Sequence, residues 1–466
     1  MNFLNRLVIP ESNEHLTLLK YLLVIVTILF VTYTSIALVA STFSAYFDVR
    51  GKRKGNRTYL KFARNLIDLA APNRGLIFSL AVLPLVTAIL IYTQLLYGMN
   101  LGISTYLSYA AVFYFVGFYF LYSYNRSSHL DTIYRTFRQL AKSHASEVDS
   151  EVSTDVDSFE RSITNIRRKA GRRGAVLLWI ATWIFVGTTR LAFTPDRWAT
   201  SSFLTVLFSS QTFWSFVDYV VSALVVTSAA VLFFFFVWDN GIVNSADNAY
   251  RSFVKKFSLT VGIIFVAIEP LLIFFEIQNL PQHSLSSATF GLAGIAMFIA
   301  FLLLHMFYSM LKDSRINLGT YAFIGVVLLV SIWAAKDEIA FSHATRVQDQ
   351  VLGQRYAEMV EDLNPNRSVA VISGEDIFNG RCSACHRFDV KLVGPPYNQT
   401  LPNFVGKMDS LEDFIMNPRQ VVPGYPPMPN QGLKPAEVKA VAEYIMGVYL
   451  KTHPQAAKKD TATVKM

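Results

Sequence analysis

The sequence predicts an all-α protein, in which a polytopic bundle of about eight transmembrane helices over residues 1–335 precedes a small extracytoplasmic domain at 371–450. The first observation is composition: 52% of the residues are hydrophobic and 16% are charged, against about 25% charged in soluble proteins. The second is a series of apolar stretches, each long enough to cross about 30 Å of hydrocarbon as a helix. The third is that basic residues gather in alternate connections between these stretches.

The apolar stretches lie near 17–42, 76–98, 103–123, 174–193, 212–238, 258–279, 286–311 and 317–335. Lys and Arg are concentrated in the first, third, fifth and seventh connections, and Arg197 is the exception in the even-numbered ones. Since cytoplasmic loops carry the excess of basic residues, both termini are predicted to lie outside. We expect a multi-pass protein of the bacterial inner (cytoplasmic) membrane, with its C-terminal domain in the periplasm. No cleavable signal peptide is expected in residues 1–16.

Two segments outside the spans have a structure of their own. The connection at about 124–174 has apolar residues at helical spacing, which predicts two cytoplasmic amphipathic helices. A hairpin that packs on the bundle is the simpler interpretation, and a docking surface for a partner is the alternative. Residues 336–370 are predicted to form a polar extracytoplasmic connector, broken at Asn364-Pro365-Asn366. Residues 451–466 form a polar tail.

The strongest chemical signal is Cys382-Ser383-Ala384-Cys385-His386, a C-x-x-C-H sequence. Two thiols about one helical turn apart can add to the two vinyl groups of a haem, and the adjacent histidine then reaches the iron. The sequence has only these two cysteines, so a zinc site or a disulfide is the alternative. Neither of these explains the pattern of residues between Gly394 and Met428.

Residues 371–450 resemble the monohaem class I cytochrome c family. The resemblance rests on five elements in order: Gly374-x-x-x-Phe378-x-x-x-Cys382, the C-x-x-C-H sequence, Gly394-Pro395-Pro396, a helix that ends at Asn417-Pro418 followed by the loop 423–429, and the helical segment 435–445. The resemblance implies one covalent haem c on Cys382 and Cys385. It also implies iron ligation by His386 and Met428, with the Pro395 carbonyl orienting His386.

Three other methionines of this domain are weaker candidates for the distal ligand. Met408 lacks a proline-rich loop, whereas Met416 and Met446 fall on predicted helices, where methionine is more often a core residue. Ligation by histidine and methionine raises the reduction potential of a haem. With both axial positions filled, the iron is suited to electron transfer rather than to oxygen chemistry.

Ionisable residues inside the apolar stretches are candidates for function. Asp218, Glu269 and Glu276 suit a proton route or a quinone pocket, and Arg190 is positioned to pair with one of them; simple buried pairing is the alternative. His305 is the histidine placed inside a span. Because a membrane haem b normally needs two axial ligands, we expect no haem b and interpret His305 as a hydrogen-bonded histidine.

About 200 residues of the apolar half resemble the large subunit of cytochrome bd quinol oxidases, in the early helices and in Phe213-Trp214-x-Phe216. This chain has Asp218 near the position where that family supplies a histidine, and it lacks that family's quinol-binding loop motif. The departures imply that the haem and oxygen chemistry of this half has been lost.

These observations favour an electron-transfer subunit of a respiratory or photosynthetic membrane complex over a complete enzyme. The expected partners are membrane subunits such as a quinol-oxidising or cytochrome b protein, and an extracytoplasmic carrier or oxidase. Quinone is a further candidate partner, whereas nucleic acid is not expected. The alternatives are a quinol oxidase or quinol:cytochrome c oxidoreductase subunit with its own buried site, and a transporter or assembly protein that senses redox state.

Overall fold

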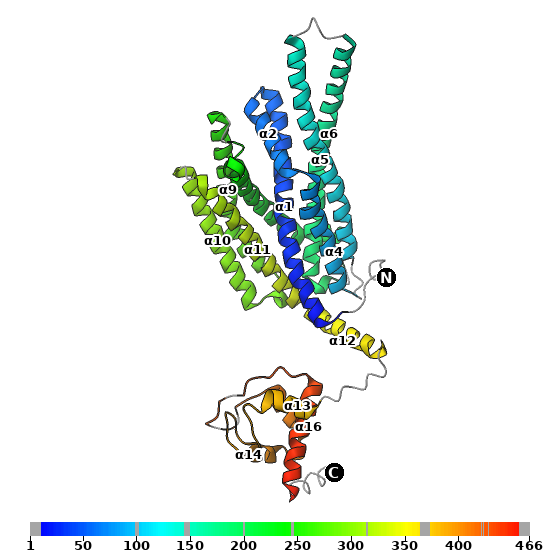
Figure 1. Cartoon of the computed structure of the whole chain (residues 1–466), viewed down its shortest axis with the longest axis vertical. Helices are drawn as coiled ribbons and strands as arrows, with labels where there is room; N and C mark the ends of the chain where they lie inside the picture. The colour runs from blue at the N-terminus through cyan, green and yellow to red at the C-terminus, as the bar shows by residue number, and fades with distance from the viewer. Residues whose placement is uncertain are drawn as a thin grey trace. The chain divides into compact units, whose positions relative to one another are not determined.

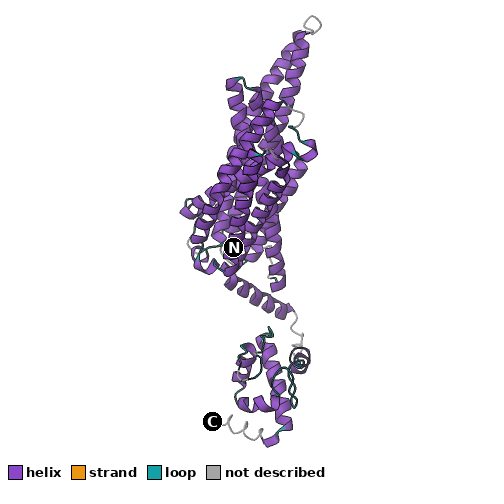
Figure 2. Cartoon of the chain, turned by 90° about the vertical axis from the view of Figure 1, so that its left-hand side faces the viewer, coloured by secondary structure: helices purple, strands orange, loops and turns teal. Residues whose placement is uncertain are grey.

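The computed structural model describes residues 11–97, 102–143, 150–198, 201–243, 247–313, 316–363, 373–420, 422, 424–426 and 428–455. Within these residues the chain is helical and has no strand (Figures 1 and 2), which confirms the predicted all-α class. The chain divides into two compact units, Met1–Met359 and Val360–Met466. The predicted break at 364–366, two prolines of the loop 423–429 (423 and 427) and tail residues 456–466 lie outside the described residues.

Among the described residues of the first unit, eight helices are long and apolar enough to cross a membrane, which confirms the predicted number. They are α1 (Asn13–Lys54), α3 with η2 and α4 (Arg74–Ile77, Phe78–Val82, Leu83–Leu95), α5 (Ile103–Ser143), α6 (Ser150–Ala192), α8 (Ser210–Phe236), α9 (Asn248–Gln278), α10 (Ser287–Lys312) and α11 (Gly319–Ala344). The shorter elements are α2 (Arg57–Ala70), η3 (Pro195–Arg197), α7 (Phe203–Leu207), η4 (Trp238–Asn240), η5 (Gln282–Ser284) and η6 (Ile316–Leu318).

Helix α1 lies at the centre of the bundle, where it packs against α2, α4, α6, α8 and α11 (Figure 1). Its start is capped by Ser12, whose side chain accepts a hydrogen bond from the backbone N–H of His15. Its end is closed by Gly55 in the left-handed conformation, with φ 64°. At 1.5 Å per residue the helix is about 63 Å long, so its basic last turn extends well beyond an apolar layer of about 30 Å.

The connection at 124–174 does not form two separate amphipathic helices. Instead, α5 and α6 continue without a break through most of it, as the long hairpin at the top of Figure 1 shows. Ile133, Phe159 and Ile166 are exposed on this extension, so these apolar residues do not pack on the bundle as the simpler interpretation expected. A span that continues as a helix keeps its backbone hydrogen bonds satisfied, which explains why the predicted boundary is absent.

The predicted polar connector begins later than the sequence suggested. Helix α11 continues to Ala344, and Lys336 is 2% exposed inside the bundle. After Thr345, α12 (Arg346–Leu363) makes most of the remaining connector helical. Residues 336–344 are therefore part of the helical bundle, because Glu276 of α9 and the adjacent Asp337 neutralise Lys336.

The second unit is built from short helices around a small core. Its elements are α13 (Gly374–Ile377), η7 (Phe378–Cys382), α14 (Tyr397–Thr400), η8 (Leu401–Phe404), α15 (Met408–Met416) and α16 (Pro435–Thr452). The first and last of these cross at Gly374, where a Cβ would lie 2.7 Å from the carbonyl carbon of Ala440. Phe378, Leu401, Leu411 and Ile445 belong to the core, which brings the Cys382 segment against α16.

Candidate functional site

The two cysteines lie on the turn that ends the first helix of the second unit. Ser373 caps that helix by accepting a hydrogen bond from the backbone N–H of Asp376. The backbone N–H groups of Cys385 and His386 then donate to the carbonyl of Cys382, at 3.1 and 2.9 Å. Both thiols are free, with Cys382 buried and Cys385 half-buried. Burial, followed by the neighbouring Cys385, raises the pKa of the Cys382 thiol.

His386 is oriented by the loop that follows it. Its Nδ1 atom lies 3.2 Å from the carbonyl oxygen of Pro395. Because a carbonyl can only accept, Nδ1 carries the proton and Nε2 keeps its lone pair for a metal. Burial lowers the pKa of His386 and the Pro395 carbonyl partly opposes this, so the neutral, metal-binding form is favoured. The ring also stacks on Tyr397, with centroids 5.0 Å apart and planes 5° apart.

The glycine before Pro395 is required by this arrangement. A Cβ on Gly394 would lie 2.6 Å from Nδ1 of His386, closer than real Cβ contacts allow. The backbone N–H of Gly394 donates to the carbonyl of Cys385 at 2.9 Å, which ties the loop to the cysteine turn. The sequence Gly394-Pro395 therefore supplies both the space beside the imidazole and the carbonyl that orients it.

Met428 lies across the same pocket from a second loop. The pocket is lined by His386 and Met428 together with apolar side chains that include Leu401, Phe404 and Ile445. The loop is held by hydrogen bonds from the Gln420 and Asn430 side chains to the carbonyls of Tyr425 and Met416, at 2.8 and 3.0 Å. Gly424, with φ 87°, makes its turn.

The three other methionines that the structure describes in the second unit do not line this pocket. Met408 and Met416 begin and end α15, and Met446 is 2% exposed in the core. The pocket thus brings together the His386 imidazole and the Met428 thioether between mainly apolar walls, and the two thiols precede His386 on the cysteine turn. This donor set fits a covalently held haem with two axial ligands.

The structure confirms the predicted pairing of Arg190 with one of the three acids inside the apolar helices. Arg190 pairs with Glu276 at 2.6 Å, and Glu269 accepts a hydrogen bond from Ser222 at 2.7 Å. Asp218 is 6% exposed. His305 is exposed on α10 and has no hydrogen bond within the described residues, so its interpretation as a hydrogen-bonded histidine is wrong for the single chain.

Sequence reasoning missed two residues of the buried charge group. Lys336 and Asp337 were assigned to the polar connector because they follow the last apolar stretch. In the structure Lys336 Nζ lies 2.5 Å from Glu276 Oε2 and 3.1 Å from Asp337 Oδ1. The sequence does contain a signal for the burial of Lys336. No helix-breaking residue stands in Trp333-Ala334-Ala335-Lys336, so the last span can continue as a helix. The predicted pairing of Arg190 with one acid also leaves two acids of the apolar stretches without a cation.

Comparison with known proteins bears on the second unit. The sequence model of the cytochrome c family matches residues 371–448. Cytochrome c-551 of Stutzerimonas stutzeri is 34% identical over 79 residues, which are 16% of this chain and 76% of that protein. Cytochrome c-551 of Ectopseudomonas mendocina is 35% identical over 78 residues, 16% of this chain and 95% of that protein. Cytochrome c-552 of Hydrogenobacter thermophilus is 33% identical over 70 residues, 14% and 71% of the two chains.

Proposed function

This chain belongs to the cytochrome c family, and on that premise we propose that it is the membrane-anchored electron-transfer subunit of a larger complex. Its C-terminal domain carries one covalent haem c, and the cytochrome c domain implies electron transfer. The eight apolar helices suggest a multi-pass membrane protein. In the proposal, electrons arrive from a quinol-oxidising or cytochrome b partner in the membrane and leave to an extracytoplasmic carrier or oxidase.

The observation that carries this proposal is that His386 and Met428 line one apolar pocket next to the cysteine turn. When bound, the haem iron supplies a one-electron couple between its ferrous and ferric states. Cys382 and Cys385 hold the group in place through two thioether bonds. His386 presents Nε2 to the iron while Pro395 fixes the ring through Nδ1. Met428 would offer its thioether sulfur to the iron from the second loop, and a haem held by histidine and methionine would be suited to electron transfer.

The proposed orientation follows from charge and chain order. An even number of spans supports the proposal that the cytochrome domain is on the same side of the membrane as the N-terminus. The basic ends of α1 and α10 and the basic first turns of α9 belong to connections on the opposite side, which the positive-inside rule assigns to the cytoplasm. Haem attachment to C-x-x-C-H sequences outside the cytoplasm agrees with this orientation.

The test combines haem analysis with topology. Replacing both Cys382 and Cys385 by alanine should abolish the haem stain that survives denaturing electrophoresis. A reporter that is active only outside should work when fused after Leu450 and fail when fused at position 146. Stain retained by the double variant would disprove covalent attachment, and reporter activity at both positions would disprove the proposed orientation.

The partner is tested by reconstitution. The purified chain should accept electrons from a soluble small reductant but should not oxidise a quinol by itself. Quinol oxidation should appear only when a membrane subunit that co-purifies with the chain is added. Quinol-dependent haem reduction by the single chain would instead favour an enzyme with its own buried site.

A further inference from the structure

Four charged residues of α6, α9 and α11 form a balanced group, here called the ion cluster: Arg190, Glu276, Lys336 and Asp337. Arg190 of α6 reaches Glu276 of α9 at 2.6 Å and Asp337 of α11 at 3.6 Å. Lys336 reaches the second oxygen of Glu276 at 2.5 Å. Two cations therefore face two carboxylates, and each member of the ion cluster has an opposite charge within 4 Å.

Two further carboxyl groups lie beside the ion cluster without a cation of their own. Asp218 of α8 is 6% exposed and makes no hydrogen bond or ion pair within the described residues. Glu269 of α9 is 2% exposed and accepts one hydrogen bond, from Ser222. Glu269 lies seven residues before Glu276, about 10 Å deeper along the helix.

The number of charges around Asp218 and Glu269 indicates their protonation state. The charged groups that face Asp218 are the four members of the ion cluster, and those that face Glu269 are Asp218 and Glu276. The cations of the ion cluster are already matched, so two additional anions would be buried uncompensated, which is strongly unfavourable in an apolar interior. At least one of the two carboxyl groups must therefore hold a proton.

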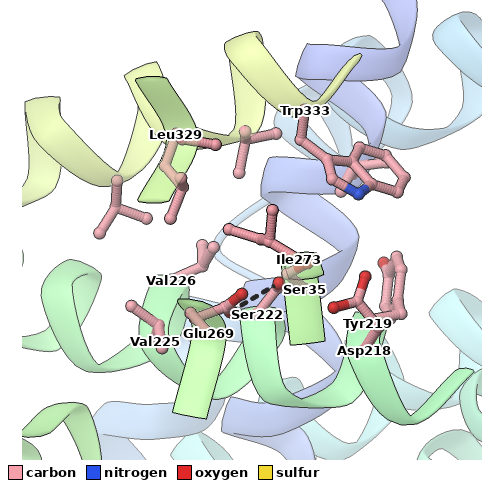
Figure 3. Close-up of a pocket in the computed structure, with 14 residues that line it drawn as sticks. Ser35, Asp218, Tyr219, Ser222, Val225, Val226, Glu269, Ile273, Leu329 and Trp333 are labelled. Atoms are coloured by element: carbon pink, nitrogen blue, oxygen red, sulfur yellow. Dashed lines mark hydrogen bonds between the residues drawn. The ribbon is translucent and has the colours of Figure 1, made fainter. Parts of the chain in front are cut away.

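The two carboxyl groups face a small cavity between α1, α8, α9, α10 and α11 (Figure 3). Its volume is about 40 Å³, and its other walls are mainly valine, leucine and isoleucine side chains. The Nε1 atom of Trp333 is buried at this cavity and has no hydrogen-bond partner among the residues that the structure describes. Such a volume has room for about three water molecules. The cavity is too small for the ring of a quinone. Its polar atoms without a hydrogen-bond partner are therefore suited to binding water and to passing protons.

Asp218 also lines a second, larger pocket of about 180 Å³, which connects the site to one end of the bundle. This pocket includes Arg190, Gln211, Ser215 and Glu276, near the first residues of α8 and the last residues of α9. Arg197 is exposed at the same pocket. Asp218 is thus shared by the outer pocket and the inner cavity, and it separates Glu269 from the bundle end.

From this arrangement we infer that Asp218 and Glu269 form a proton-binding site inside the bundle, supplied with protons through the pocket beside the ion cluster. A proton enters at the polar pocket, passes to the Asp218 carboxylate and moves through water in the inner cavity to Glu269. The ion cluster holds α6, α9 and α11 together around this route. The inference does not depend on the cytochrome domain, and it gives the membrane half a role in proton transfer beyond anchoring.

Labelling of the full chain tests the protonation state. Dicyclohexylcarbodiimide is an apolar reagent that adds to protonated carboxylic acids and leaves a stable N-acylurea, which peptide mass spectrometry can locate. At neutral pH we expect label on Asp218 or Glu269 and none on Glu276, whose two oxygens are ion-paired. The labelling rate should fall about tenfold per pH unit above its midpoint. Absence of label on both residues, or equal label on Glu276, would overturn the inference.

Infrared spectroscopy of the same protein tests the connection to water. The carbonyl band of a protonated carboxyl group should be present in the wild-type chain, disappear in Glu269→Gln or Asp218→Asn, and shift promptly when the buffer is exchanged for D₂O. Ser222→Ala is the matched control, because it keeps both acids and should only move the band. Haem content and elution volume check folding of each variant. A missing band, or a band that stays unshifted over hours in D₂O, would contradict the proposed route.

Discussion

Gly394 packs against the His386 ring so closely that a Cβ on Gly394 would lie 2.6 Å from Nδ1, the atom that bonds the Pro395 carbonyl. Gly394→Ala should therefore displace either the ring or the loop and weaken that hydrogen bond. We expect the haem to stay attached, the reduction potential to change, and the domain to lose about 1–3 kcal/mol of stability. Redox titration and thermal unfolding measure these effects.

Gly380→Ala is the matched control for this prediction. Gly380 lies on the same helical segment as Cys382, and a Cβ there would meet nothing within 4 Å. Alanine in a helix is more favourable than glycine by about 0.5–1 kcal/mol, so this variant should be neutral or slightly stabilised. Equal behaviour of the two variants would show that the space beside His386 is not required.

Met428→Ala should leave the haem attached and open the sixth coordination position. The methionine band in the near infrared should disappear, and the potential should fall, because thioether ligation favours the ferrous state. Met416→Ala is the control, since Met416 ends α15 and its side chain does not line the pocket. A wild-type spectrum for Met428→Ala would assign the distal ligand to another residue.

The close crossing of the first and last helices of the cytochrome domain leads to a prediction about the stability of that domain. Gly374→Ala would place a methyl group 2.7 Å from the carbonyl carbon of Ala440, so α13 and α16 would have to separate. We expect a loss of about 1–3 kcal/mol in the free energy of unfolding, measured by denaturant titration of the full chain through the haem signal. Gly447→Ala on α16, where a Cβ meets nothing within 4 Å, should not destabilise the domain. Comparable stability of the two variants would argue against close helix contact at Gly374.

The features predicted most accurately from the sequence are those that depend on residues close together in the chain. The number of apolar helices and the residues from Cys382 to His386 follow from short windows of sequence, because span length and haem attachment depend on neighbouring residues. The ion cluster was predicted in part: the sequence indicates that Arg190 pairs with an acid of a neighbouring span, but which acid it is depends on how α6 packs against α9. Lys336 was missed for the same reason: a charge that follows an apolar stretch looks solvent-exposed until its partners on other helices are known.

The exposed position of His305 gives a prediction about the membrane half. Ionisable residues inside membrane spans normally face the bundle interior, yet His305 lies on the outer face of α10 in line with the exposed Phe298, Phe301 and Tyr308. On the proposal that the chain works beside a membrane partner, we expect a helix of that partner to cover this face. We expect His305→Ala to leave the stability of the single chain unchanged and to weaken association with that subunit, measured by co-purification. Phe301→Ala on the same face keeps the histidine and is the matched comparison.

The same geometry bears on whether the bundle holds a second redox centre. A haem b in the membrane interior needs axial ligands from helices that face each other across it, and His305 points away from every helix of this chain's core. Met306 follows it directly and is rotated by about 100°, and Met297 lies about 12 Å away along the same helix, so neither can complete a site with it. We therefore expect the purified single chain to show a c-type spectrum only, with one haem per chain, and His305→Ala to keep that haem content. A pyridine haemochrome spectrum with a b-type component that is lost in His305→Ala would reverse this conclusion and favour an enzyme with its own quinol chemistry over an electron-transfer subunit.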